Sequence, residues 1–159
     1  MKVLDIMRGT TVDGPGFRTS IYLSGCRHHC PGCHNPQSWD PDGGTEYSLE
    51  EILAIVKEED FDVTLSGGDP LFDPESTALL AGEITRLGYG VWIYTGYTWE
   101  QIMADDRLLN AVKDAEVVVD SPFIEALKDP DLLFRGSSNQ QLVDVKRSLS
   151  EGKAVSYPG

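Results

Sequence analysis

Long hydrophobic runs are absent from this 159-residue chain, whose apolar stretches extend over only a few residues. A membrane-spanning helix needs about 20 consecutive apolar residues, so no transmembrane segment is expected. The first residues lack a small-residue cleavage site, and Asp5 interrupts their apolar part, which argues against a secretory signal. We therefore expect a cytoplasmic protein that does not insert into a membrane.

Basic residues are also scarce: 13 Lys and Arg residues oppose 26 Asp and Glu residues, which gives a formal net charge of −13. A surface that binds nucleic acid or an anionic membrane needs a basic field. The charge therefore argues against both kinds of partner. An excess of carboxylates that only keeps the protein soluble is the plain alternative explanation.

Cysteine is rare too, and the three that occur, Cys26, Cys30 and Cys33, lie within eight positions. An odd, clustered set does not fit the spaced, even set of a secreted disulfide framework. Glycine and proline between and beside these cysteines let the backbone curl so that three thiolates surround one soft metal centre. The spacing C-x3-C-x2-C thus predicts a metal site.

Three thiolates are an incomplete set, because a structural zinc site and a ferredoxin cluster each take four protein ligands. His28, His29 or His34 could complete a zinc site. A four-iron cluster on three cysteines would instead leave one iron open to a substrate or cofactor. The spacing alone does not decide between these two sites, although His28 and His29 are expected to face solvent if the thiolates already satisfy a cluster.

The remaining composition, 40% hydrophobic and 25% charged, is ordinary for a globular protein, and the length favours a single domain over residues 1–159. Strand-like and helix-like segments alternate, which predicts an α/β fold with parallel strands. Strands are expected at residues 1–7, 17–24, 61–66, 91–95, 116–120 and 141–145, and helices after Ser48, after Asp73 and near Thr98.

Functional residues of parallel sheets gather where the strands end. Four candidates follow predicted strands: the cysteine loop, Gly67-Gly68-Asp69-Pro70, Thr95-Gly96-Tyr97 and Asp120. The glycines would let the backbone approach a ligand, and Asp69 would accept a hydrogen bond from an amine, worth roughly 1.5–3 kcal/mol. An ordinary turn at residues 67–70 and an ordinary cap at Asp120 are the plain alternatives.

The cysteine loop and the Gly67-Gly68-Asp69 turn together resemble the radical S-adenosylmethionine enzymes. Asp13-Gly14-Pro15-Gly16-Phe17-Arg18 is similar to the opening of glycyl-radical-enzyme activases. Thr95-Gly96-Tyr97 and Arg135-Gly136-Ser137-Ser138-Asn139-Gln140 are similar to segments of the activases of anaerobic ribonucleoside-triphosphate reductase. The resemblance spans about residues 10 to 140.

The resemblance implies a [4Fe-4S] cluster on Cys26, Cys30 and Cys33, which would be both its metal ligands and the catalytic residues, with S-adenosyl-L-methionine on the open iron. It implies an incomplete, TIM-like α/β barrel of five or six parallel strands with outer helices. The cofactor-binding residues that it implies are Gly32, Cys33, His34, Gly67, Gly68, Asp69 and Thr95. His34 stands where the reductase activases commonly carry tyrosine.

The resemblance further implies a reaction in which the reduced cluster cleaves S-adenosylmethionine, and the resulting radical removes a hydrogen atom from a glycine of anaerobic ribonucleoside-triphosphate reductase. A low-potential donor such as flavodoxin or ferredoxin would supply the electron. Two alternatives remain: an activase of another glycyl radical enzyme, such as pyruvate formate-lyase, and a non-catalytic zinc-binding interaction module. Arg18 would contact the cofactor carboxylate or pair with a surface acid, and residues 137–139 would lie at the cofactor edge, dock the partner or form a mere turn.

Overall fold

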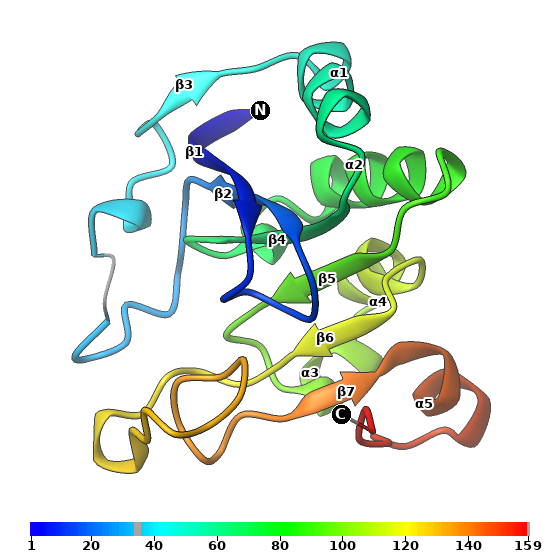
Figure 1. Ribbon diagram of the computed structural model, residues 1–159. Helices are drawn as coiled ribbons and strands as arrows, with labels where there is room; N and C mark the ends of the chain where they lie inside the picture. Colours follow the sequence, from blue (N-terminus) through cyan, green and yellow to red (C-terminus); the bar gives the residue numbers. More distant parts are fainter. Residues whose placement is uncertain (34–35, 159) are drawn as a thin grey trace.

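The computed structural model describes residues 1–33 and 36–158, and these residues build one mixed sheet with helices against it (Figure 1). The strands are β1 (Lys2–Thr10), β2 (Arg18–Leu23), β3 (Thr45–Glu46), β4 (Asp62–Gly67), β5 (Val91–Tyr94), β6 (Val117–Val119) and β7 (Leu142–Asp144). The α-helices are α1 (Leu49–Glu59), α2 (Pro74–Arg86), α3 (Trp99–Met103), α4 (Asp106–Val112) and α5 (Val145–Glu151). Short 3-10 helices are η1 (Pro36–Trp39), η2 (Pro70–Phe72) and η3 (Glu125–Leu127).

The sheet order is β3-β1-β2-β4-β5-β6-β7, and its centre is parallel. Strands β2, β4, β5 and β6 pair in parallel, which confirms the predicted α/β class with a parallel core and outer helices. Within the described residues the parallel run has four strands rather than five or six, because β1 and β7 pair antiparallel with β2 and β6. The connection from β1 to β2, residues 11–17, is too short for a crossover helix, so it can only form a hairpin.

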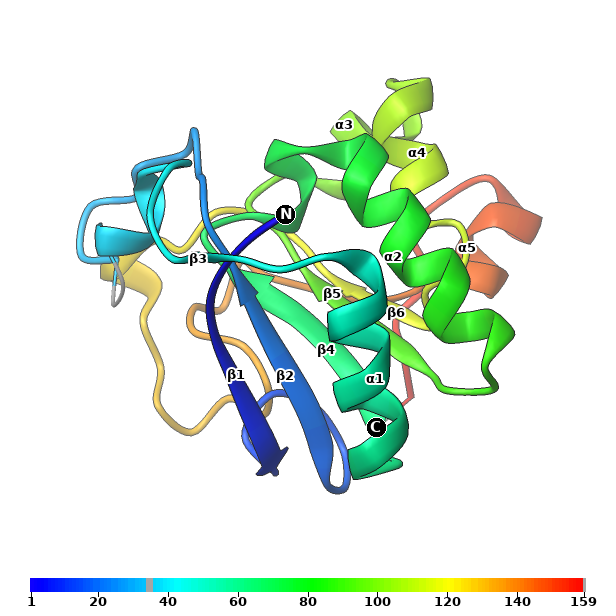
Figure 2. The ribbon, with the colours of Figure 1, turned by 90° about the horizontal axis from the view of Figure 1, so that it is seen from above.

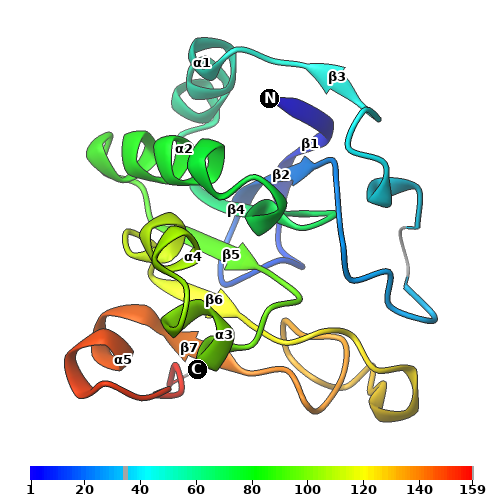
Figure 3. The same ribbon diagram turned by 180° about the vertical axis from the view of Figure 1, so that it is seen from behind.

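The two faces of the parallel strands differ in chemistry. On the face toward the helices, alternate residues such as Ile21, Leu65 and Ile93 are fully buried in the main hydrophobic core. The opposite face carries polar and aromatic side chains, including Thr64 on β4 and Trp92 on β5. Figure 2 places the helices on one side of the sheet. Figure 3 shows α2 next to α4 along this side.

The helix starts follow the sequence signals. Ser48 and Glu51 form a reciprocal capping box at α1, which provides hydrogen-bond partners at the exposed end of the helix. Asp73 caps α2 ahead of Pro74, and Thr98 caps α3. These three predicted starts are confirmed, and they fix where each loop between strand and helix ends. Among the described residues, none of the helices combines the length and apolar composition that crossing a bilayer requires.

Candidate metal centre and cofactor cavity

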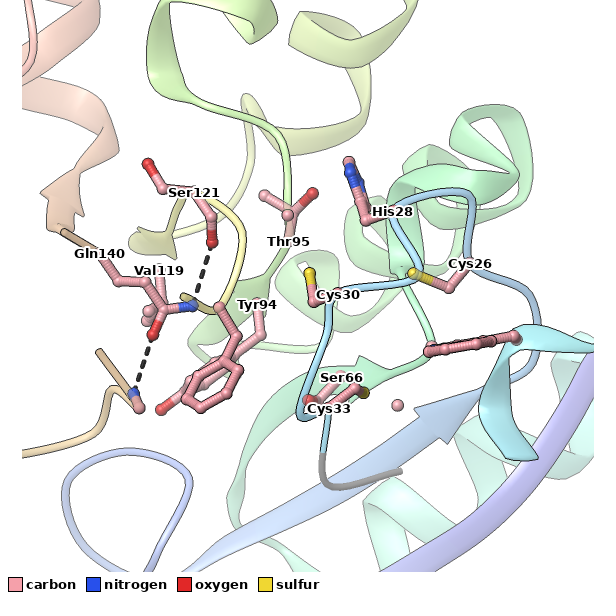
Figure 4. A pocket seen from close by; sticks show the side chains of 16 residues that line it. Cys26, His28, Cys30, Cys33, Ser66, Tyr94, Thr95, Val119, Ser121 and Gln140 are labelled. Atoms are coloured by element: carbon pink, nitrogen blue, oxygen red, sulfur yellow. Dashed lines mark hydrogen bonds between the residues drawn. The ribbon is translucent and has the colours of Figure 1, made fainter. Parts of the chain in front are cut away.

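A cavity of about 260 Å³ opens at the carboxyl ends of β4, β5 and β6 (Figure 4). All three cysteines lie on one side of it, and Ser121 and Gln140 lie on the other. The lining residues are Cys26, His28, Cys30, Cys33, Trp39, Ser66, Gly67, Gly68, Tyr94, Thr95, Gly96, Val119, Ser121, Phe123, Gly136 and Gln140. Three of the four strand-end candidates, the cysteine loop and the turns at residues 67–70 and 95–97, therefore converge on one space.

The cysteine loop, residues 25–33, is held by backbone hydrogen bonds at its start. Gly25 donates to Ser38 O over 2.7 Å, and its own carbonyl accepts from Asp69 N over 2.7 Å. Gly25 has a φ of +102°, a conformation that favours glycine. The loop is thus fastened to the turn after β4 before the first cysteine.

The three cysteines are thiols without a disulfide. Burial raises the pKa of the Cys26 and Cys30 thiols above their ordinary value. Backbone N–H groups oppose this effect: those of His28 and His29 donate to Cys26, and that of Phe123 donates to Cys30. A negative metal-bound sulfur is stabilised by such donors.

The donor set fits an iron–sulfur cluster. Three cysteine sulfurs face one cavity, and hydrogen bonds to cluster sulfurs are among the features by which proteins tune cluster potentials. In residues 1–33 and 36–158, no three His, Cys, Asp or Glu side chains are grouped as they would be around a single metal ion. A four-iron cluster separates its sulfur ligands more widely than one ion does. The assignment of Cys26, Cys30 and Cys33 as cluster ligands stays a prediction.

The predicted cofactor turn lies directly against the cysteine loop. Both Gly67 and Gly68 line the cavity. A Cβ at Gly68 would stand 2.3 Å from Gly25 O and 2.6 Å from Ser38 O, and Gly67 has a φ of +106°. The close approach of three backbone segments therefore explains why this turn carries two glycines.

Asp69 occupies a different position from its two neighbours. Its side chain is 2% exposed and does not line the cavity. Oδ1 accepts from Leu71 N over 2.9 Å, whereas Oδ2 accepts from Thr95 Oγ1 and Gly96 N, each over 3.0 Å. The Nε2 of His28 lies 2.7 Å from the same Oδ2. The expected contact between Asp69 and a cofactor amine stays a prediction.

The two loop histidines lie in different environments. His29 is exposed and stacks on Trp39, with 4.4 Å between the ring centroids, so its expected solvent-facing position is confirmed. The expectation was wrong for His28, whose side chain is only 18% exposed. The sequence pattern offered no means of distinguishing the two, because the partner of His28 lies 41 residues away.

Other predicted site residues fall into three groups. Thr95 and Cys33 line the cavity, and their predicted contacts with a cofactor stay predictions. Gly32 does not line it, and a Cβ there would collide with the side chain of Glu125. His34 lies outside the described residues.

Asp120 acts within the protein. Its Oδ2 accepts from Trp99 N at the start of α3, and its Oδ1 accepts from Gln141 N, each over 2.9 Å. The side chain is fully buried, and this burial raises the pKa of its carboxyl. These contacts join distant segments instead of capping the turn that follows Asp120, and Asp120 does not line the cavity.

Arg18 forms no ion pair with a surface acid among the described residues, and it does not line the cavity. It is 2% exposed at the start of β2, where Nε donates to Thr64 Oγ1 and one terminal nitrogen donates to Val63 O. The guanidinium also lies 5.4 Å from the centre of the Trp92 ring, and burial lowers its pKa. Arg18 thus stabilises the polar face of the sheet.

Gln140 was predicted only as part of the motif at residues 135–140, yet this residue organises the far side of the cavity. Its Oε1 accepts from Gly136 N over 2.8 Å and from Ser137 N over 3.1 Å, and its Nε2 donates to Ser121 O over 3.0 Å (Figure 4). Residues 135–140 therefore form a tied loop, and Gly136 and Gln140 line the cavity. The motif that contains Gln140 was the only sequence signal of this role.

Comparisons with known proteins agree with the geometry. Residues 12–143 match the family described as "4Fe-4S single cluster domain". The chain is 36% identical over 140 residues to the anaerobic ribonucleoside-triphosphate reductase-activating protein of Salmonella typhi, which covers 81% of this chain and 89% of that protein. The proteins of the same name from Escherichia coli K12 and Enterobacteria phage T4 are 34% and 29% identical, over 81% and 82% of this chain and 89% and 86% of theirs. The chain therefore belongs to the 4Fe-4S single cluster domain family and to the anaerobic ribonucleoside-triphosphate reductase-activating proteins.

Proposed function

We propose that residues 1–159 form a single radical S-adenosylmethionine domain that generates a glycyl radical on an anaerobic ribonucleoside-triphosphate reductase. The observation that carries the proposal is the meeting of three thiols with the glycine turns of two parallel strands around one cavity. A cluster held by three thiols keeps one iron available, and the glycine turns leave backbone room for a ligand beside it.

In this proposal Cys26, Cys30 and Cys33 hold a [4Fe-4S] cluster, and S-adenosyl-L-methionine occupies the rest of the cavity. Gly67, Gly68 and Thr95 would border that ligand. Gly32, His34 and Asp69 remain further candidates from the family resemblance. The chain's own task is to bind, to orient and to keep solvent away from the reacting centre.

When bound, a reduced cluster would supply the one electron that breaks a carbon–sulfur bond of S-adenosylmethionine, giving methionine and a radical fragment, and that fragment would take a hydrogen atom from a glycine of the reductase and leave the radical there. The electron would come from a low-potential donor such as flavodoxin or ferredoxin. We place the reaction in the cytoplasm, because the three thiols require a reducing compartment.

The proposal is tested by anaerobic reconstitution with iron and sulfide, followed by electron paramagnetic resonance of the reduced protein with and without S-adenosylmethionine. We expect a [4Fe-4S] signal that changes when S-adenosylmethionine is added. Cys26→Ser should abolish normal cluster assembly while the circular dichroism spectrum stays unchanged. A chain that takes up only zinc, or a cluster whose signal ignores S-adenosylmethionine, would contradict the proposal.

The choice of partner needs a second experiment. The reconstituted protein is mixed with a reductant, S-adenosylmethionine and either anaerobic ribonucleoside-triphosphate reductase or pyruvate formate-lyase. A glycyl radical signal on the reductase alone is the expected result. A signal on pyruvate formate-lyase alone would support the proposed reaction but contradict the proposed partner.

A further inference from the structure

His28 lies inside the cysteine loop, two residues after Cys26, yet its side chain faces away from solvent. Its Nε2 lies 2.7 Å from Asp69 Oδ2. A carboxylate oxygen only accepts hydrogen bonds, so the imidazole donates from Nε2. A hydrogen bond to a charged acceptor in a largely buried place is among the stronger ones in proteins.

The carboxylate that receives this hydrogen bond is already fixed by the strand-end turns. Leu71 N, Gly96 N and Thr95 Oγ1 donate to Asp69 from the turns after β4 and β5. We call these donors, together with Asp69 and His28, the Asp69 cluster. Within residues 1–33 and 36–158, His28 is the donor to Asp69 that comes from the cysteine loop.

Contacts with Gly96 and Tyr97 also fix the orientation of the imidazole ring. A Cβ on Gly96 would stand 2.5 Å from His28 Cδ2, so the ring lies directly on the glycine backbone. The edge of the ring meets Tyr97, with the centroids 4.7 Å apart and the planes at 81°. The residues of the Thr95-Gly96-Tyr97 turn thus provide a seat that a larger residue at position 96 would block.

We propose that His28 is a positioning residue, which fastens the cysteine loop to the ends of β4 and β5 through Asp69 and so sets the places of Cys26 and Cys30 at the cavity. The backbone N–H of His28 donates to Cys26 at the same time, so one residue joins a thiol to the Asp69 cluster. The inference about loop position stands without the proposed function. Its consequence for a bound cluster rests on that function.

The loop tether is tested by hydrogen exchange of the full chain, followed by mass spectrometry of peptides that contain residues 25–33 and 95–97. His28→Ala should speed exchange in both peptides by about ten- to a hundredfold, because a buried hydrogen bond to a charged acceptor is lost. His28→Gln should restore slow exchange, since its amide nitrogen reaches about as far as Nε2 and also donates. His28→Asn, whose amide is too short, should behave like His28→Ala.

The neighbouring histidine provides a matched control. His29 has a φ of +46°, which asparagine tolerates, so His29→Asn changes the same kind of side chain in the same loop without straining the backbone. Exchange in the two peptides should stay near the parent rate. In an Asp69→Ala background, His28→Ala should add little, because the acceptor of the His28 hydrogen bond is already absent.

A second readout uses the reconstituted protein. The rate at which a chelator removes iron should rise by about tenfold in His28→Ala and return toward the parent rate in His28→Gln. If the parent assembles no cluster, the proposed function is contradicted, and the hydrogen-exchange result still shows whether His28 holds the cysteine loop in place.

The tether is overturned if His28→Ala exchanges like the parent, or if His28→Gln is as fast as His28→Ala and His28→Asn. An equal effect of His29→Asn would also overturn it, because the loop would then respond to any change. Should His28→Ala fail to fold, the comparison of His28→Gln with His28→Asn gives the same decision.

Discussion

The two sides of the cavity are built by different means. On the cysteine side, the Asp69 carboxylate accepts hydrogen bonds from the cysteine loop and from the turns after β4 and β5. On the other side, the neutral amide of Gln140 ties residues of one segment, 121–140, to one another. The hydrogen bonds of Asp69 join parts of the chain that are distant in sequence, whereas those of Gln140 join residues of one loop.

This difference predicts how each side responds to damage. Removing a long-range junction should loosen several elements together, since each of them loses a partner. Removing a local tie should loosen one segment and leave the sheet intact. Both sides share a dependence on small residues, because Gly96 gives room to His28 on the cysteine side and Gly136 gives room to Phe123 on the other. The following predictions separate the two sides.

The largest effect is expected on the cysteine side, from Gly68→Ala. The added Cβ would meet two backbone carbonyls, Gly25 O and Ser38 O, which belong to hydrogen-bonded segments. We expect the free energy of unfolding to fall by about 3 kcal/mol, because backbone atoms cannot move aside as a flexible side chain can. Chemical denaturation measures this loss.

Gly82→Ala is the matched control for that change. Gly82 lies inside α2, where a Cβ would only touch Asp114 Oδ2 at 3.6 Å. Alanine should stabilise the protein by about 0.5–1 kcal/mol, since it favours the helix. If both substitutions lowered the free energy of unfolding, the close packing at Gly68 would not explain its loss of stability.

A smaller and more local effect is expected from Gln140→Ala on the other side. Gly136 N and Ser137 N would lose their acceptor, and Ser121 O its donor. The cost should be about 2 kcal/mol, with faster hydrogen exchange confined to residues 121–141. Gln141→Ala, at an exposed neighbour, should change stability by less than about 0.5 kcal/mol. Faster exchange in the cysteine loop of Gln140→Ala would contradict the independence of the two sides.

The parts of this architecture that the sequence predicts are those with local causes. Strand alternation, the Ser48 capping box and the Asp73-Pro74 helix start each depend on residues a few positions apart, and each is confirmed. The parallel centre followed from the alternation of strands and helices. The direction of β7 did not, because residues 120–141 contain only a short 3-10 helix, η3, among the elements described there.

The site was predictable as a set of segments and not as a set of contacts. The cysteine loop and the turns at residues 67–70 and 95–97 converge because the carboxyl ends of parallel strands meet at one edge. Which carboxylate oxygen meets which histidine depends on packing between residues 41 positions apart. No pattern within the loop distinguishes His28 from His29, and only the fold brings Asp69 and Gly96 to one of them.

The smallest effect at neutral pH is expected for Tyr94, which lines the cavity between the two sides. Its hydroxyl is buried and makes no hydrogen bond within the described residues, and burial raises its pKa above the ordinary value of 10.0. The unfolded chain therefore ionises first, and the contribution of the neutral phenol, present below about pH 10, is lost as the pH rises toward the folded pKa. The free energy of unfolding of the parent should then fall by up to about 1.4 kcal/mol per pH unit more steeply than that of Tyr94→Phe. Denaturation curves from pH 7 upward measure both slopes.

Tyr22→Phe is the control, because it removes a hydrogen bond to Asp13 and should therefore destabilise the protein already at neutral pH. Parallel slopes for the parent and Tyr94→Phe would mean that the phenol is open to solvent, and the two sides of the cavity would then not enclose it.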